Sequence, residues 1–161
     1  MTTTDGLSVV RELASGEKWL AVLVTTRPNG TPGVSVVNAG ILAHPVTGET
    51  VIGFVSRGGT AKLANLRHEP TATLVFRSGW EWISVSGPVE LIGPDDPADG
   101  VNIPHLLRDI YAAAGGNHPD LDEYDRAMVA DRRTAVLLTP GRFTTNPPGT
   151  DHEEPKDEES A

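Results

Sequence analysis

Short apolar runs separated by tight-turn sequences dominate the first half of this chain and restrict what it can fold into. Residues 19–26, 34–43 and 50–55 are rich in Val, Ile, Leu and Thr, as β-strands are. The segment Arg27-Pro28-Asn29-Gly30 separates the first two runs, and His44-Pro45-Val46-Thr47-Gly48 separates the next two. Both segments are typical of turns. Three short strands at hairpin spacing predict an antiparallel barrel or sandwich.

Two more apolar runs extend this pattern. Residues 71–76 predict a fourth strand, and residues 80–92 predict a long fifth strand with a bend or bulge at Gly87-Pro88. Alternate residues of the fifth strand form an apolar set, which suits a barrel interior, and a set with tryptophan and serine, which suits an interface or a site. The apolar set is Ile83, Val85, Val89 and Leu91, and the other set is Trp80, Trp82, Ser84 and Ser86.

Helical spacing of apolar residues appears in four places. It predicts a leading helix that ends near Gly16, after a loose start over residues 1–6. A short helix follows Thr60 as N-cap, and two more are expected near residues 103–114 and 120–132. Residues 134–139 predict the last strand. We therefore expect an N-terminal segment over residues 1–16, and a mainly β domain over residues 17–147 with a helical insertion before its last strand.

Charge and composition exclude several classes of function. The 161 residues carry a formal net charge of -9 and no cysteine, which excludes disulfides, thiolate chemistry and the common zinc sites. The acidic balance disfavours nucleic-acid binding. The absence of a signal pattern and of an apolar run of about 20 residues predicts a cytoplasmic protein without a membrane segment. Residues 148–161 hold six acidic residues and one lysine, and we expect a disordered tail there.

A cationic segment stands out against this acidic background. Between Thr50 and His68 there are three Lys or Arg residues and no Asp or Glu. A helix that starts after Thr60, with Lys62 and Arg57 nearby, predicts a phosphate site built from a helix N-terminus and cations. Gly58 and Gly59 are expected to let a ligand approach the backbone. The alternative is that these charges are ordinary solvated side chains. There is no Walker sequence and no dinucleotide-binding glycine motif.

Three segments of the sequence carry a family resemblance. TTRPNGTPGVSVV at residues 25–37, FVSRGGTAKLANLRHEPTATLVF at 54–76 and WEWISVSGPVELIGPDD at 80–96 resemble the split β-barrel flavin and deazaflavin oxidoreductases. That superfamily includes pyridoxamine phosphate oxidase-like proteins and reductases that use the deazaflavin coenzyme F-420. The resemblance implies a six-stranded antiparallel split β-barrel with FMN-binding-like topology. It also implies a homodimer with the cofactor at the subunit interface.

The resemblance also implies roles for individual residues. In this superfamily the lysine of the second segment and the polar residues before it hold the cofactor phosphate. The matching positions, with the intervening alanine, are Ser56, Arg57, Thr60, Ala61 and Lys62. On the neighbouring strands, Asn38 either approaches the cofactor ring or is an ordinary bonded strand residue. Trp82 either lines the site or fills the dimer interface.

The cofactor and the reaction follow as expectations. The cationic segment carries more positive charge than one phosphate requires, and the Arg27 turn adds a further cation, which favours F-420 with its longer anionic tail. Pyridoxamine phosphate oxidases of this superfamily carry an Arg-Leu-x-Pro type of ending. This chain lacks it, which disfavours vitamin-B6 oxidation. We expect hydride transfer from reduced F-420 to a small unsaturated or heteroaromatic substrate. An FMN-dependent enzyme and a non-catalytic flavin- or haem-binding protein remain alternatives. No side chain is identified as a catalytic acid or base, and His44 is expected to be solvated.

Overall fold

The computed structural model describes residues 1–146, and the expected acidic tail at 148–161 lies outside them. Its six longest strands close into an antiparallel barrel in the order β4-β1-β2-β3-β6-β5, with β5 pairing back onto β4. This confirms the mainly β, six-stranded barrel expected from the sequence. The strands are β1 Leu20–Thr26, β2 Pro32–Ala43, β3 Thr50–Ser56, β4 Thr71–Ser78, β5 Glu81–Ile92, β6 Thr134–Leu138 and β7 Arg142–Thr145.

The long strand β5 changes partners where the sequence predicts a bend. Up to Pro88 it pairs with β4, and from Val89 to Ile92 it pairs with β6. The additional strand β7 pairs with residues 83–86 of β5. Gly87-Pro88 therefore marks the corner at which one strand passes from one part of the sheet to the other.

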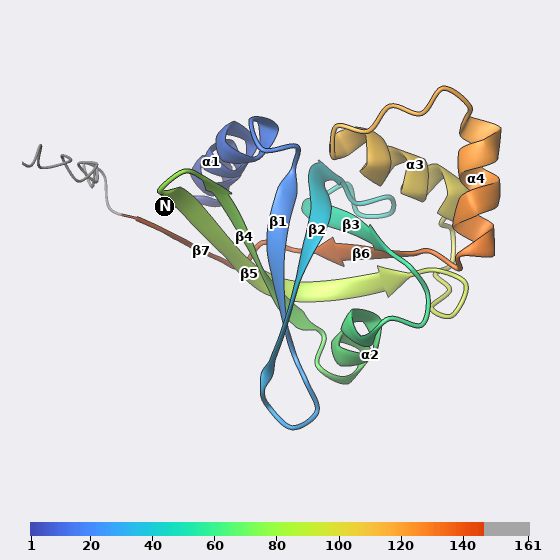
Figure 1. Ribbon diagram of the computed structural model, residues 1–161, viewed down its shortest axis with the longest axis horizontal. Helices are drawn as coiled ribbons and strands as arrows, with labels where there is room; N and C mark the ends of the chain where they lie inside the picture. The colour runs from blue at the N-terminus through green and yellow to red at the C-terminus, as the bar shows by residue number, and fades with distance from the viewer. Residues whose placement is uncertain (147–161) are drawn as a thin grey trace, which may run out of the picture.

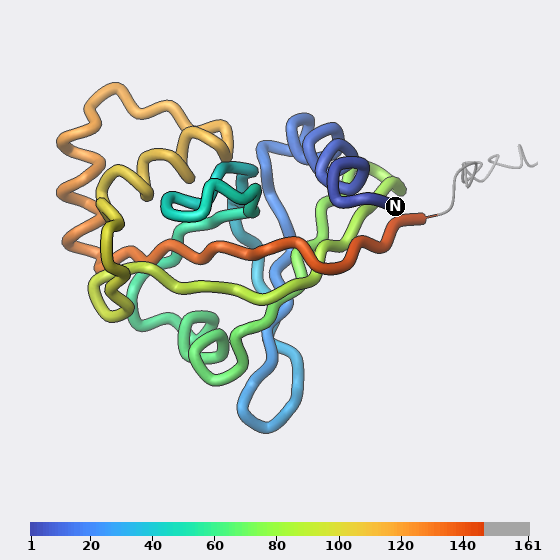
Figure 2. The backbone as a smooth tube through the Cα atoms, turned by 180° about the vertical axis from the view of Figure 1, so that it is seen from behind, coloured from blue at the N-terminus to red at the C-terminus, as the bar shows by residue number. Residues whose placement is uncertain are grey.

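Four helices surround the barrel. In Figure 1, α1 (Thr3–Ser15) lies at the upper end of the barrel and α2 (Ala61–His68) at the lower end. The insertion before β6 forms α3 (Ile103–Ala113) and α4 (Leu121–Ala130), which pack beside the barrel (Figure 2). None of the described helices has both the length and the apolar character needed to cross a membrane.

The expectation of a loose start was wrong. The side chain of Thr2 accepts a hydrogen bond from the Asp5 N–H, and the Asp5 carboxylate accepts one from the Thr2 N–H. This reciprocal capping box starts α1 at Thr3.

Two apolar cores explain the long hydrophobic runs. The first fills the barrel and includes Leu13 of α1 and Leu63 of α2. The second lies outside the barrel, where Leu107 and Ile110 of α3 pack against Ala135 and Leu137 of β6. Because β6 lies between the two cores, all five of its residues are buried.

Candidate functional site

A pocket of about 310 Å³ lies between the N-terminus of α2 and the β1–β2 hairpin. The hairpin loop projects past the barrel on the same side as α2 in both Figure 1 and Figure 2. The pocket thus joins the cationic segment to the turn that precedes β2. Its lining residues are Thr25, Arg27, Gly33, Val34, Ser35, Thr60, Ala61, Lys62 and Asn65.

The charges in this pocket have one sign. Arg27 and Lys62 line it, and none of the lining residues in the described part of the chain is acidic. One guanidinium nitrogen of Arg27 donates to the Pro32 carbonyl at 2.6 Å, which holds the side chain against the hairpin. The structure therefore brings together the lysine of the cationic segment and the arginine of the turn, 35 positions apart in the sequence. Two cations without a carboxylate favour an anionic ligand.

The N-terminus of α2 faces the same pocket. Thr60 is the N-cap residue, as expected, but its side chain makes no cap hydrogen bond. Its hydroxyl instead contacts the buried Ser56 hydroxyl at 3.0 Å. The N–H of Ala64 bonds to the Thr60 carbonyl, so the N–H groups of residues 61–63 precede the hydrogen bonds of the helix. Helix N-termini with open N–H groups attract phosphates.

A buried polar contact fixes α2 against the hairpin. The Asn65 side-chain amide donates to the Thr25 hydroxyl at 3.1 Å, and that hydroxyl donates to the Gly33 carbonyl at 3.4 Å. Thr25 is not among the site residues predicted from the sequence. A signal for it existed, because Thr25 has the same strand parity as the buried Ala21 and Leu23.

Arg57 and Gly58 are turned toward the helical insertion. Arg57 pairs with Asp131 at 3.4 Å, and the Gly58 N–H donates to the Asp131 carbonyl at 3.1 Å. A Cβ on Gly58 would lie 2.8 Å from the Cβ and carbonyl oxygen of Arg132. The expectation that Gly58 leaves room for a ligand was therefore wrong. Gly59 has a φ of +76°, which a side chain would strain.

Asn38 and Trp82 do not line this pocket. The Asn38 amide donates to the carbonyls of Lys18, at 2.7 Å, and Ala114, at 3.2 Å. Asn38 also lines a second pocket, which lies against α3 and α4. Trp82 lies near the start of β5 beside β7, where its carbonyl accepts from the Thr145 hydroxyl at 2.6 Å.

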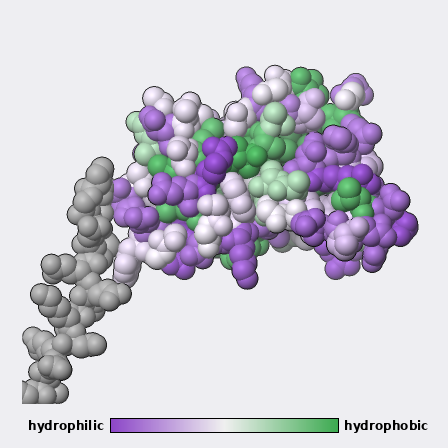
Figure 3. Space-filling model, turned by 90° about the horizontal axis from the view of Figure 1, so that it is seen from above, coloured by the Kyte–Doolittle hydropathy of each residue, from purple (hydrophilic) through white to green (hydrophobic). Residues whose placement is uncertain are grey.

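An exposed apolar strip on β2 connects the two pockets. Val34 lines the first pocket and Asn38 lines the second. Val36 lies between them on the same face of the strand and is 62% exposed. At about 3.3 Å per residue, the strip from Val34 to Asn38 is about 13 Å long. Elsewhere on the surface, the view from above also shows hydrophobic side chains in the middle of the molecule, with polar regions on both sides (Figure 3).

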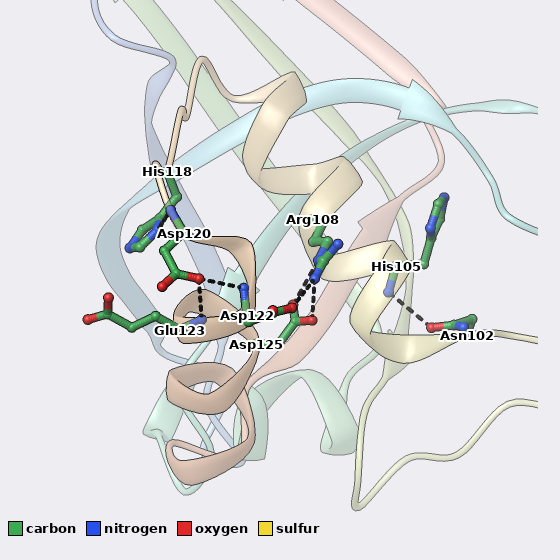
Figure 4. A network of polar contacts seen from close by, with 8 residues as sticks. All are labelled: Asn102, His105, Arg108, His118, Asp120, Asp122, Glu123 and Asp125. Atoms are coloured by element: carbon green, nitrogen blue, oxygen red, sulfur yellow. Dashed lines mark hydrogen bonds and ion pairs between the residues drawn. The ribbon is translucent and has the colours of Figure 1, made fainter.

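The helices beside the second pocket are joined by a bidentate ion pair (Figure 4). Arg108 of α3 donates to both carboxylate oxygens of Asp125 of α4, at 2.9 and 2.6 Å. The Arg108 guanidinium lowers the pKa of Asp125, and Asp125 raises the pKa of Arg108. The pair holds α4 in place against α3.

The described histidines do not form a metal site, and His44 is held by hydrogen bonds. No group of three or more His, Cys, Asp or Glu residues could hold a metal within residues 1–146. His44 is only 11% exposed, so the expectation of a solvated side chain was wrong. Its Nδ1 accepts from the N–H groups of Val46 and Thr47, and its Nε2 contacts Glu90 at 2.8 Å. Both ring nitrogens are therefore engaged.

The sequence profile of the pyridoxamine 5'-phosphate oxidase family matches residues 10–146. Among solved structures, a related FMN-binding protein from Nostoc punctiforme is 15% identical with a TM-score of 0.59, covering 90% of this chain and 84% of its own. An F420 reductase is 18% identical with a TM-score of 0.55, covering 79% and 90%. The haem storage protein from Vibrio cholerae is 12% identical with a TM-score of 0.53, covering 89% and 94%. At these identities the structures share the fold.

Proposed function

Because the chain belongs to the pyridoxamine 5'-phosphate oxidase family, we propose that it is an oxidoreductase that binds coenzyme F-420. One observation carries the proposal: Lys62, Arg27 and the open N-terminus of α2 line a pocket to which the described residues contribute no carboxylate. These donors fit a phosphate, and the second cation suits a longer anionic tail. Bound in its reduced form, the deazaflavin supplies a hydride.

The residues of the chain have binding and positioning roles. Lys62 and Arg27 neutralise the phosphate, and the N–H groups at the start of α2 donate to its oxygens. The strip from Val34 through Val36 offers an apolar surface to a flat ring, leading toward Asn38. The substrate we propose is a small unsaturated or heteroaromatic molecule next to that ring.

We also propose that a second copy of the chain covers this strip. Val34 and Val36 are 64% and 62% exposed, and Leu20 and Val22 of β1 extend the apolar surface. An apolar sheet face of this kind is a typical interface. In the homodimer, the partner would close the strip against water and complete the site.

FMN is the second candidate. The same pocket can accept its single phosphate, and one similar structure is described as FMN-binding. The haem reading has less support, since both ring nitrogens of His44 are engaged.

The experiment is a titration of the protein with F-420 and with FMN. We expect Lys62→Ala to raise the Kd for F-420 at least about tenfold, or ~1.4 kcal/mol, because one charge-assisted contact is lost. The free energy of unfolding should change by less than about 0.5 kcal/mol, since Lys62 is only half-buried and lies outside both apolar cores.

Arg11→Ala, which removes an exposed charge from α1, is the matched control and should leave the Kd unchanged. An equal Kd for wild type and Lys62→Ala would remove the phosphate assignment. Tight FMN binding with no F-420 binding would favour the second candidate. F-420 binding without consumption of the reduced form by any acceptor would favour a carrier.

A further inference from the structure

The second pocket lies between the outer face of the barrel and the helical insertion. It has a volume of about 200 Å³, and Asn38 of β2 and Val55 of β3 form its barrel side. Tyr111 of α3 and Tyr124 of α4 form the opposite side, with Arg133 just before β6. Because Asn38 ends the apolar strip, this pocket adjoins the place where we put the cofactor ring.

Arg133 has fewer hydrogen-bond acceptors than its guanidinium can use. Its Nε is buried and has no partner among the described residues. Its Nη2 donates to Asp131 at 3.2 Å. No acidic residue among residues 1–146 lines the pocket. A buried guanidinium nitrogen without an acceptor is costly, and a carboxylate is the group that best matches its paired donors.

The rest of the lining suits a flat ring. The rings of Tyr111 and Tyr124 have centroids 4.8 Å apart. The Tyr124 hydroxyl donates to the Leu107 carbonyl at 3.2 Å, and burial raises the pKa of Tyr124, so that its ring is held in place and neutral. Val55 and Met128 add apolar surface. A cavity of about 150 Å³ can hold benzene, so this one has room for a single substituted ring.

Arg133 also borders a neighbouring pocket of about 260 Å³, which is a poorer anion site. Asp125 is one of its lining residues and places a carboxylate there. Arg132 in the same pocket pairs with Asp95, as Arg133 pairs with Asp131, but among residues 1–146 only Arg133 has a buried guanidinium nitrogen without a partner. An anionic ligand is therefore better accommodated beside Tyr111.

We propose that the pocket beside Tyr111 is the substrate subsite and takes a small planar aromatic or unsaturated carboxylate. The carboxylate binds Arg133, and the ring lies between the tyrosines and the barrel. The role of this pocket as a substrate subsite rests on the proposed function. Binding of a planar carboxylate in it does not depend on that function.

The test is a titration of the full-length protein, without cofactor, with benzoate and with benzamide at pH 7. These probes have the same ring and nearly the same size but differ in charge. We expect benzoate to bind at least tenfold more tightly. The NMR signals of the Arg133 Nε–H and the Tyr111 ring should shift as benzoate is added. This measurement on the wild-type protein needs no variant that might fail to fold.

Two variants sharpen the result. Arg133→Gln should weaken benzoate binding at least tenfold, while Arg126→Gln on the exposed side of α4 should leave it unchanged. Equal affinity for benzoate and benzamide, or unmoved Arg133 and Tyr111 signals, would overturn the proposal. Lys62→Ala separates it from the cofactor assignment, because this variant should lose F-420 affinity and keep benzoate affinity. Retained benzoate binding in a protein that binds neither F-420 nor FMN would leave the acid site standing and remove the proposed function.

Discussion

Asn65 is the residue on which the geometry of the candidate cofactor pocket depends. It lies in the middle of α2, is 8% exposed, and reaches the Thr25 hydroxyl across 40 positions of sequence. A buried amide is stabilised only while its hydrogen bonds are made. This contact therefore sets the distance between Lys62 on α2 and Arg27 on the hairpin.

We expect Asn65→Ala to lower the free energy of unfolding by about 1–2 kcal/mol, because a buried hydrogen bond is lost and a small cavity remains. Urea unfolding measures the change. Cofactor affinity should fall as well, since α2 is no longer fixed to β1. Asn117→Ala, at an exposed position in the α3–α4 connection, should change stability by less than about 0.5 kcal/mol. Equal free energies of unfolding for both variants would show that the Asn65 contact does not stabilise the fold.

Single residues also show where sequence reasoning succeeds. Thr60 and Lys62 could be placed at a helix start because a capping residue and a short apolar period are local signals. Arg57 could not be assigned, since its partner Asp131 is 74 positions away and only the folded chain brings them together. Arg133 gave no local signal either, because it becomes a pocket residue only when α4 packs beside β3.

At the scale of elements, the helical insertion depends on the contact between α3 and α4. Leu107 and Ile110 of α3 reach the barrel, while Tyr124 is the only buried residue of α4. The ion pair of Arg108 with Asp125 therefore has a large part in holding α4. Loss of that pair should loosen the outer wall of the pocket beside Tyr111.

Acid should loosen this wall by protonating Asp125. The pKa of Asp125 is lowered in the folded state, so its stabilising effect is complete above the unfolded pKa of about 3.9 and is lost as the pH falls through the lower folded value. We expect the Tm of the wild type to drop below about pH 4.

In Asp125→Asn the Tm at pH 7 should be lower and should depend less on pH in this range. Thermal unfolding followed from pH 3 to 7 measures both effects. Asp99→Asn removes an exposed carboxylate that makes no ion pair within residues 1–146, and it should retain the wild-type pH dependence. If the Tm of Asp125→Asn and of the wild type had the same pH dependence, the ion pair would make no contribution to stability.

The elements themselves were largely predictable. Six strands and four helices produce apolar periods that are visible in short windows of sequence. The exception is β7, because the four residues of Arg142–Thr145 form a strand only by pairing with β5. The capping box of α1 was present in the sequence as Thr2 and Asp5, but it lies among threonines that resemble a loose terminus.

On the scale of the whole molecule, the exposed strip on β2 is the surface where we propose that a second copy binds. Along the strip, residues 32–38 of β2 pair with β1, and β3 pairs only with residues 39–43. A partner would contact the exposed side chains of Val34 and Val36. The sequence predicted an interface or a site on the face of Trp80 and Trp82, where Trp80 is 70% exposed, and Val34 and Val36 form a second exposed surface that the sequence did not single out.

We expect Val36→Glu to shift the protein to the monomer, because a carboxylate would be buried without a partner at the interface. Sedimentation velocity over a range of protein concentrations measures the shift. Val46→Glu is a matched control, since Val46 is also 62% exposed but lies in the turn between β2 and β3. A wild type that sediments as a monomer at all concentrations would contradict the proposed homodimer.

The position of β6 between two cores has a consequence for how this protein can be changed. The barrel and the helical insertion share β3 and β6 as a common wall, so removal of α3 and α4 would expose Val51, Ile92 and Leu137 to water. The insertion is therefore not a detachable module. Replacing it with a different insertion would destabilise the barrel, whereas point substitutions on its inner surface leave the shared wall intact. Divergence in ligand preference within such a fold should proceed by single side chains.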